Sequence, residues 1–484
     1  MQRLHEECEW SAMNRQRLDG AKGTIRALEG CLEVAILTIA YYLVWRNGYP
    51  GGIFPNYFGN GKYVLIGVYG LLIVVLFNNF DGFMFGYLRL SEVIISQCIA
   101  VAIANFITFW QLCLIANVVI TPIPILILTA IEAGIIFVCC YLYVFMYHKL
   151  YAPKNMVMIY GSENAVYLKF KMDTRRDKYH ITKLISVDEG VEAICRQLDA
   201  YDAVIINDVG AEVRNDILKY CYEHRIRAYA SPKVTDIVIR GATEICLFDT
   251  PLLLVRGRGL TVTQKVIKRA LDILLSVIAM IVASPIMLLV ALAIKCEDGG
   301  PVFYRQDRVT LNGKVFSILK FRSMIVNAEK DGKSQPATGR DPRITKVGNI
   351  IRATRIDELP QILNILKGDM SIVGPRPERV EHVEKYTQEL PEFTYRLKVK
   401  GGLTGYAQIY GKYNTSAYDK LRLDLMYIEN YSILLDIKLI LLTIRIILKK
   451  ESTEGFEKQE ELERKKNEML NQSALPADDT QRQK

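Results

Sequence analysis

The chain has 484 residues, half of them hydrophobic, and its mean hydropathy is positive at +0.13. These values argue against a wholly water-soluble protein and predict membrane-embedded segments. The formal net charge of +9 suits an anionic membrane surface or phosphorylated substrates, and we expect no nucleic-acid partner. The ten cysteines show no C-x-x-C spacing, which argues against a zinc site. The polar, charged N-terminal residues argue against a cleavable signal peptide.

Residues 1–150 are predicted to form a membrane domain with four transmembrane helices. The apolar runs are Cys31–Trp45, Tyr63–Phe80, Val93–Val118 and Ile123–Met146. Basic residues precede the first run and follow the fourth, whereas the loop at 47–61 carries none. By the positive-inside rule, both ends of the domain then lie in the cytoplasm. Glu132, inside the fourth run, is interpreted as a helix–helix hydrogen-bonding group.

Residues 151–260 are predicted to form a small Rossmann-like α/β domain. Strands at Val157–Tyr160, Ala203–Ile206 and Arg227–Tyr229 alternate with helices at Val191–Leu198 and Ala211–His224, as in a parallel sheet. The segment that begins at Gly161 is similar to a dinucleotide-binding loop but lacks the G-x-G-x-x-G spacing. A folded spacer, a regulatory module or a dimer contact is therefore preferred to nucleotide binding.

A fifth apolar run covers Ala270–Ile294, and its length alone permits a spanning helix. Two features favour instead a re-entrant helix over 266–295, which enters and leaves the membrane on the same face. Ser284-Pro285 lies inside the run, where proline breaks or kinks a helix. Basic residues flank both ends, with Arg269 before the run and Lys295 after it, as expected for two cytoplasmic ends.

Two segments that roughly alternate apolar and polar residues, Gly300–Val309 and Phe316–Met324, predict a hairpin with its turn at Asn312-Gly313. A basic surface hairpin is the simplest interpretation of both. Residues 328–344 are polar with glycine and proline, and they predict a mobile loop. The apolar segment Ile433–Leu448 contains interspersed charges and predicts an interfacial helix in preference to a buried one. A charged tail follows over 451–484.

The stretch Arg352–Glu378 contains two adjacent carboxylates, Asp357 and Glu358. Pro360 is tolerated only in a first helical turn, so a helix is predicted to begin near Asp357 and to end at Gly368. Its predicted buried face consists of Ile356, Leu359, Ile362, Leu363 and Leu366. The positive end of the helix dipole would favour an ionised carboxylate, a metal ion or a phosphate. Alternatively, Asp357 is only the N-cap of this helix.

The rigid turn Gly374–Pro377 presents Arg376, whose guanidinium can grip phosphate oxygens with two hydrogen bonds. The whole stretch D-E-L-P-Q-x-x-N-x-L-x-G-D-M-S-x-V-G-P-R-P resembles the core motif of the bacterial sugar transferases, the monotopic polyprenyl-phosphate phosphoglycosyl transferases. Further segments that resemble this family are Arg305–Arg308 (R-Q-x-R), Lys320–Met324 (K-F-R-S-M), Val399–Gln408 (a Gly-rich loop) and Asp424–Asn430 (D-x-x-Y-I-x-N). The chain departs from the family pattern at Gly401, Tyr406 and Lys412, which stand for proline, tryptophan and arginine.

The resemblance implies a fold class of membrane α plus α/β. Four transmembrane helices and a Rossmann-like domain would precede an α+β phosphoglycosyl transferase domain over 261–450. That domain would be built on the re-entrant membrane helix, with the helix break at Ser284 and Pro285. The resemblance also implies a multi-pass protein of the bacterial inner membrane, in contact with membrane lipids and with its catalytic domain on the cytoplasmic face. The middle domain makes a homodimer plausible.

The reaction implied by the resemblance transfers a sugar 1-phosphate from a UDP-sugar to undecaprenyl phosphate and releases UMP. By the same resemblance, this would be the first membrane step of exopolysaccharide, capsule, O-antigen or glycoprotein glycan synthesis. Asp357 would form an aspartyl phosphosugar, and Glu358 would hold Mg²⁺. The implied substrate- or phosphate-binding residues are Lys320, Arg322, Arg352, Arg376, Gln408 and Lys412. The alternatives are a UDP-releasing glycosyltransferase, for which no convincing D-x-D motif is found, and a non-enzymatic assembly scaffold.

Overall fold

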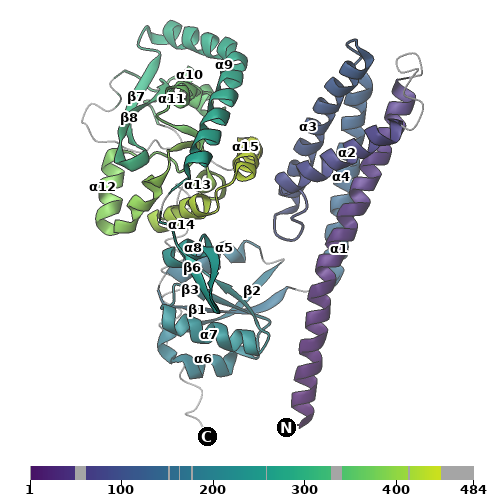
Figure 1. The fold of residues 1–484 in the computed structure, drawn as a ribbon, viewed down its shortest axis with the longest axis vertical. Coiled ribbons are helices and arrows are strands. Elements are labelled where there is room, and N and C mark those ends of the chain that lie inside the picture. Colours follow the sequence, from purple (N-terminus) through teal and green to yellow (C-terminus); the bar gives the residue numbers. More distant parts are fainter. Residues whose placement is uncertain are drawn as a thin grey trace. The chain divides into compact units, whose positions relative to one another are not determined.

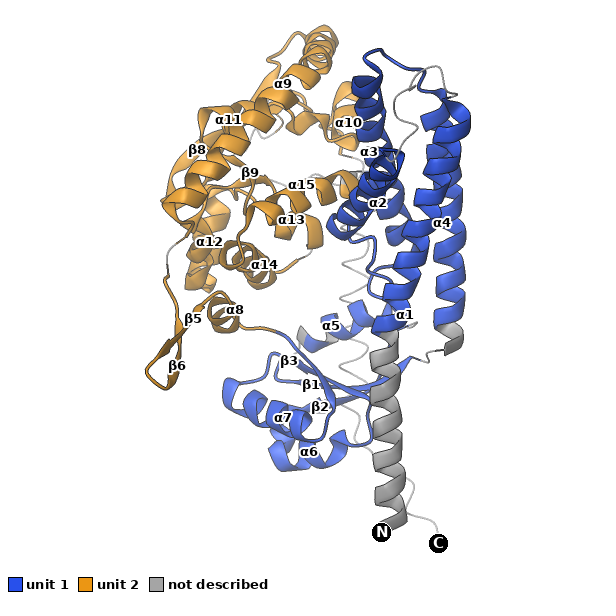
Figure 2. Ribbon diagram, turned by 45° about the vertical axis from the view of Figure 1, so that its right-hand side comes forward, with its two compact units in different colours: residues 1–231 blue, residues 232–484 orange. Residues whose placement is uncertain are grey.

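The computed structural model describes residues 2–49, 61–150, 153–162, 164–175, 178–257, 259–326, 328, 341–411 and 415–447. The contacts divide the chain into two compact units, residues 1–231 and 232–484 (Figure 2). This division falls earlier than the boundary at 260/261 that the sequence predicts. Most of the predicted mobile loop, together with Lys412 and the charged tail, lies outside the described residues.

Unit 1 begins with four long helices (Figure 1). They are α1 (Gln2–Gly48), α2 (Gly61–Asn79), α3 (Leu90–Ala116) and α4 (Ile123–Leu150). Each has a segment long and apolar enough to cross a membrane, which in α1 starts at Gly23. Large apolar side chains such as Leu114 and Phe145 are exposed on these helices, as expected for surfaces that face lipid. The prediction of apolar helices at the N-terminus is confirmed, and their passage through a membrane stays a prediction.

Glu132 of α4 is fully buried and receives hydrogen bonds from two other helices. The Tyr69 hydroxyl of α2 donates to Oε1 at 2.6 Å, and Nδ2 of Asn105 of α3 donates to Oε2 at 2.7 Å. A polar group inside an apolar bundle is costly without partners, and here all three side chains satisfy one another. The interpretation of Glu132 as a helix–helix hydrogen-bonding group is therefore confirmed.

The rest of unit 1 is a layered α/β fold. Its elements are β1 (Lys154–Tyr160), α5 (Asn164–Asp173), β2 (Tyr179–Ser186), η1 (Val187–Glu189), α6 (Val191–Leu198), β3 (Ala203–Asn207), α7 (Ala211–Glu223) and β4 (Arg227–Ala230). The strands form one parallel sheet in the order β2-β1-β3-β4, which confirms the predicted parallel topology. The central strand β3 is buried along its whole length and anchors the core of this fold.

Close packing against a neighbouring loop explains why residue 161 is a glycine. A Cβ atom at this position would lie 2.4 Å from the backbone carbonyl oxygen of Asp208, which follows β3. The Ser162 hydroxyl donates to the Asp208 carboxylate at 2.5 Å. Ligands of parallel sheets usually bind where such strands end. Here the two loops contact each other directly, so packing explains the glycine without a nucleotide.

Unit 2 consists of the long helix α9 and a set of shorter elements. The elements are α8 (Val234–Arg240), β5 (Thr243–Leu247), β6 (Thr250–Leu254), α9 (Val262–Asp298), β7 (Phe303–Val309), η2 (Leu311–Gly313), β8 (Val315–Phe321), α10 (Lys346–Ala353), η3 (Ile356–Glu358), α11 (Gln361–Lys367), β9 (Ser371–Val373), α12 (Val380–Glu389), η4 (Pro391–Lys398), β10 (Gly402–Thr404), α13 (Tyr406–Tyr410), α14 (Ala417–Glu429) and α15 (Ile433–Ile447). The predicted hairpin is confirmed as the antiparallel pair β7–β8, with positive φ at both Asn312 and Gly313.

Helix α9 continues through Pro285 where the sequence predicts a break. Figure 1 shows that the helix changes direction along its length. Pro285 has no N–H group for the Ile281 carbonyl, and the Ser284 hydroxyl donates to that carbonyl at 2.9 Å instead. The Ser-Pro pair is therefore compatible with a bent but unbroken helix. Most of the apolar surface of α9 is exposed, and α9 is long and apolar enough to cross a membrane.

The first turns of α9 are fixed to the core of unit 2 by buried polar contacts. Lys268 forms an ion pair with Asp436 of α15 at 2.6 Å, and Tyr427 donates to the same carboxylate at 2.8 Å. Asp272 accepts hydrogen bonds from the Ser371 hydroxyl and the Ile372 amide. Helix α15 buries one side against this core and exposes apolar residues such as Leu434 on another. Its location at a membrane interface stays a prediction.

Candidate active site

A tight turn between α10 and α11 carries the two candidate catalytic carboxylates. Arg355 adopts the left-handed conformation with φ 59°, and the short helix η3 follows it. Helix α11 begins only at Gln361, so the prediction that it begins near Asp357 is wrong. Pro360 holds the N-cap position, and the interpretation of Asp357 as the N-cap of this helix is wrong as well. The predicted end at Gly368 is confirmed by its φ of 97°.

The later start also changes which face of α11 is buried. Ile362 is buried as predicted, but Leu363 is 40% exposed. Asn364 and Ile365 are buried in its place. Because η3 and α11 are separate helices, a single helical period drawn through both elements misplaces Leu363.

Glu358 lies between two cations from distant parts of the chain. Nζ of Lys320, on β8, is 2.8 Å from Oε1 of Glu358, and Nη2 of Arg376 is 3.6 Å from the same oxygen. Burial alone would raise the pKa of this carboxyl, but Lys320 and Arg376 outweigh burial and lower the pKa to about 2. Glu358 is therefore ionised throughout the neutral range.

The pKa of Asp357 shifts in the opposite direction to that of Glu358. Burial raises the pKa of its carboxyl, and the neighbouring Glu358 charge adds to that effect. Lys320, Arg352 and Arg355 oppose it and favour the carboxylate. Arg352 is in the last turn of α10 and is partly buried. The structure thus brings Asp357, Glu358, Lys320, Arg352 and Arg376 into one electrostatic cluster.

The turn that presents Arg376 is held by two further arginines. Nη2 of Arg396 donates to the Arg376 carbonyl at 2.9 Å, and Nη1 of Arg308 donates to the Pro377 carbonyl at 3.1 Å. Arg396 is itself buried and forms an ion pair with the buried Asp424 at 2.8 Å. Sequence reasoning did not assign a role to Arg396, since no motif marks it. Arg308 and Asp424 belong to motifs, but their supporting contacts appear only in the folded chain.

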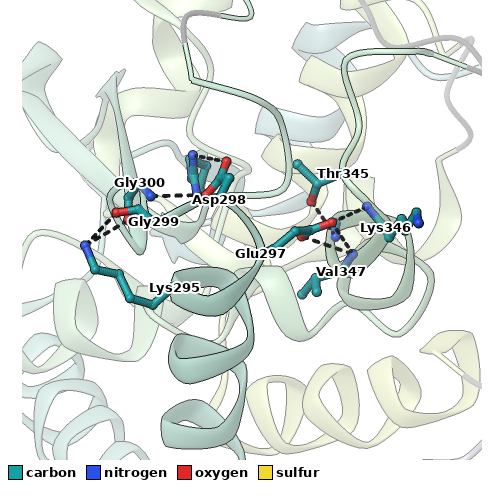
Figure 3. Close-up of polar contacts among 10 residues, drawn as sticks. Lys295, Glu297, Asp298, Gly299, Gly300, Thr345, Lys346 and Val347 are labelled. Carbon is teal, nitrogen blue, oxygen red and sulfur yellow. Dashed lines mark hydrogen bonds and ion pairs between the residues drawn. The ribbon is translucent and has the colours of Figure 1, made fainter.

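Arg322 is committed to a structural contact away from the two carboxylates. It is buried and pairs with both carboxylate oxygens of Asp298, at the end of α9, with Nη1 2.8 Å from Oδ2. Figure 3 shows this end of α9, where Glu297 also accepts from the backbone amides of Lys346 and Val347. These contacts fix the last turn of α9 to β8 and to the start of α10. A substrate contact by Arg322 would require its pair with Asp298 to open.

Gln408 supports the loop beside Arg376. Its Nε2 lies 3.5 Å from the carbonyl oxygens of Gly374 and Gly402. These glycines are in close backbone contact, because a Cβ at Gly402 would lie 2.1 Å from the Gly374 amide nitrogen. A Cβ at Gly401 would lie 2.6 Å from Cγ of Pro377, so the departure from the family's proline fits the local packing. Lys412 lies outside the described residues, and the structure does not place it.

Comparison with known proteins places this site in a family. A sequence profile described as bacterial sugar transferase matches residues 263–450. An uncharacterized sugar transferase of Bacillus subtilis is 39% identical over 183 residues, which cover 38% of this chain and 88% of that protein. The chain belongs to the bacterial sugar transferase family.

Two other relatives of this sugar transferase have named reactions. An Escherichia coli UDP-glucose:undecaprenyl-phosphate glucose-1-phosphate transferase is 43% identical over 211 residues, covering 43% of this chain and 44% of the relative. An Aeromonas hydrophila UDP-N-acetylgalactosamine-undecaprenyl-phosphate N-acetylgalactosaminephosphotransferase is 47% identical over 185 residues. The match covers 38% of this chain and 44% of that relative. The matched part therefore spans less than half the length of these two relatives. The profile match over residues 263–450 contains every candidate site residue named above.

Proposed function

We propose that this sugar transferase moves a sugar 1-phosphate from a UDP-sugar to undecaprenyl phosphate and releases UMP. The observation that carries the proposal is the ion cluster in which Lys320 and Arg376 contact Glu358 beside Asp357. Such a cluster matches the needs of phosphoryl transfer, which are a placed nucleophile and fixed positive charge. The named relatives use glucose and N-acetylgalactosamine donors, and the sugar used by this chain stays open.

In the first step an oxygen of the Asp357 carboxylate attacks the β-phosphorus of the donor. A new bond forms between that oxygen and phosphorus, the bond from the β-phosphorus to the bridging oxygen breaks, and UMP leaves with the bridging oxygen. The partial burial of Asp357 makes its carboxylate less solvated, while Lys320 and Arg352 favour its ionised form. Arg376, with its side chain 46% exposed, is available to the incoming phosphate groups.

In the second step an oxygen of undecaprenyl phosphate attacks the same phosphorus. The bond to Asp357 breaks, and the product is undecaprenyl-diphosphate sugar with the carboxylate regenerated. The lipid phosphate sits at headgroup depth, so the site must lie close to the membrane surface. The exposed apolar surfaces of α9 and α15 support that location.

The donor set at the turn suits Mg²⁺, the cofactor that the proposed reaction implies. Among the described residues, no cluster of three or more His, Cys, Asp and Glu side chains could hold a metal by itself. Mg²⁺ commonly uses only one or two carboxylates together with substrate phosphates and water. Glu358 would hold the ion beside its ion pairs with Lys320 and Arg376. Bound Mg²⁺ would neutralise charge on the diphosphate.

The Glu358→Gln substitution is expected to weaken the dependence of the rate on Mg²⁺. An amide is a poorer ligand than a carboxylate and loses the ion pairs with Lys320 and Arg376. We expect the Mg²⁺ concentration for half-maximal UMP release to rise at least about tenfold. An unchanged Mg²⁺ titration in a folded variant would remove Glu358 as the metal ligand.

We also propose that α9 is re-entrant, so that both of its ends lie in the cytoplasm. Cys246, ahead of the helix, and Cys296, at its far end, are both exposed. Single-cysteine variants that retain one or the other should both resist a membrane-impermeant maleimide in intact spheroplasts and react in inverted vesicles. Labelling of only one of the two in spheroplasts would show that α9 spans the membrane.

Nucleotide analysis tests the proposed reaction itself. Purified protein in nanodiscs receives Mg²⁺, undecaprenyl phosphate and one UDP-sugar at a time from a panel. We expect repeated UMP release from at least one donor when the lipid is present, and at most one equivalent of UMP per enzyme without it. UDP as the product would instead support the glycosyltransferase alternative, and absence of nucleotide release from every donor would support the scaffold.

A further inference from the structure

Asn364 of α11 belongs to the recognised motif, but the proposed chemistry gives it no role. Its side chain is only 3% exposed. Oδ1 accepts a hydrogen bond from the Leu319 amide at 2.9 Å, and Nδ2 donates to the Ser317 carbonyl at 2.9 Å. Both partners lie on β8: Leu319 is 45 positions and Ser317 is 47 positions before Asn364 in the chain. The side-chain amide thus pairs with the backbone of β8 in the way a neighbouring strand would.

Asn364 pairs with the edge of β8 that lies opposite to β7. Strand β7 pairs with β8 along Phe303–Val309, and β8 has no second strand partner among the described elements. Buried backbone groups at such an edge need hydrogen-bond partners. Asn364 supplies one donor and one acceptor there, while Ile365 packs beside Phe316 and Ile318 of the strand.

This contact connects the strand that carries Lys320 with the segment that carries Glu358. Lys320 directly follows Leu319 on β8, and Glu358 lies six residues before Asn364 in the chain. We infer that Asn364 is a positioning residue that sets β8 against α11 and so fixes Lys320 against Glu358. This inference rests on the proposed function for its kinetic consequence, but the contact with β8 can be tested without turnover.

The Asn364→Leu substitution removes both hydrogen bonds and keeps a side chain of similar size. Hydrogen exchange of the Leu319 amide should then become faster, because its acceptor is gone. We expect kcat for UMP release to fall about 10- to 100-fold, as for other supporting groups of a site. KM for the donor should change less than about threefold, since Asn364 does not touch substrate.

A double-mutant cycle with Lys320→Met separates positioning from general destabilisation. If Asn364 acts through Lys320, then Asn364→Leu should cost less than about threefold in the Lys320→Met background. Asn349→Leu, on the exposed side of α10, is the matched control and should leave both exchange and rate unchanged. Should Asn364→Leu fail to fold, Asn364→Asp serves in the same cycle, because it loses the donor to Ser317 alone.

Two results would overturn the inference: unchanged exchange at Leu319, or rate losses that multiply independently in the double variant. The exchange measurement also separates this inference from the proposed function. If the wild-type protein releases no UMP, the proposed function fails, while faster exchange in Asn364→Leu would still establish the contact with β8.

Discussion

The Asp357→Asn variant is expected to lose at least about 10³-fold in UMP release. Asparagine has nearly the same shape as aspartate, but its amide is not a nucleophile and forms no stable acyl phosphate. The change also leaves helix α11 intact, because Pro360, and not Asp357, holds the N-cap of that helix. A large loss of activity without loss of folding would therefore report on chemistry.

Asp307→Asn provides the matched control for this substitution. Asp307 is an exposed residue of β7 that accepts a hydrogen bond from the Ser317 hydroxyl. Its conversion should leave UMP release within about twofold of the wild type. Purified Asp357→Asn protein with wild-type activity and the same elution on size exclusion would exclude Asp357 as the nucleophile.

The Lys320→Met variant is expected to show the second largest effect. It removes the closest cation of Glu358 and leaves a largely buried carboxylate with Arg376 at 3.6 Å. We expect kcat/KM to fall about 10²- to 10³-fold, the range seen when one fixed charge-stabilising group is removed from an active site. Lys320→Arg should retain part of the rate, because it keeps the charge but not the geometry.

This variant also has a defined pH signature. In the wild type the pKa of Glu358 falls from 4.5 to about 2, which corresponds to on the order of 3 kcal/mol of stabilisation. Because the folded-state pKa is the lower one, this contribution is present above pH 4.5 and is lost as the pH falls toward 2. Without Lys320 the effect of burial is opposed only by the remaining cations, Arg376 and Arg355 among them, and the pKa of Glu358 rises. Lys320 also opposes the raised pKa of Asp357, so the acid limb of the rate profile should move to higher pH, and an unmoved limb would show that Lys320 controls neither carboxylate.

Several elements of the fold follow directly from local patterns in the sequence. The helix Val191–Leu198 has the predicted bounds, because its apolar residues keep one helical period. The hairpin turn at Asn312-Gly313 follows from the positive φ that these residues tolerate. Strand β2 was not predicted. A register shift between Met156 and Val157 leaves Thr182 unpaired in the ladder and interrupts the alternation of that strand.

The site was less predictable than the motif that contains it. Residue types pointed to Asp357, Glu358 and Arg376, but the contact of Lys320 with Glu358 joins residues 38 positions apart. Arg322 shares a motif with Lys320, yet its guanidinium pairs with Asp298. Arg396 lies in no motif, and its support of the Arg376 carbonyl depends on the packing of η4. These assignments require tertiary contacts, which a motif does not specify.

Trapping the covalent intermediate would test the central claim most directly. The protein is mixed with Mg²⁺ and the UDP-sugar that supports UMP release, but without undecaprenyl phosphate, and is then digested for mass analysis. The account predicts up to one equivalent of UMP and a sugar-phosphate mass increase on the peptide that contains Asp357. UMP that appears only after lipid is added, with no modified peptide at any time, would contradict it and indicate direct transfer between the two substrates.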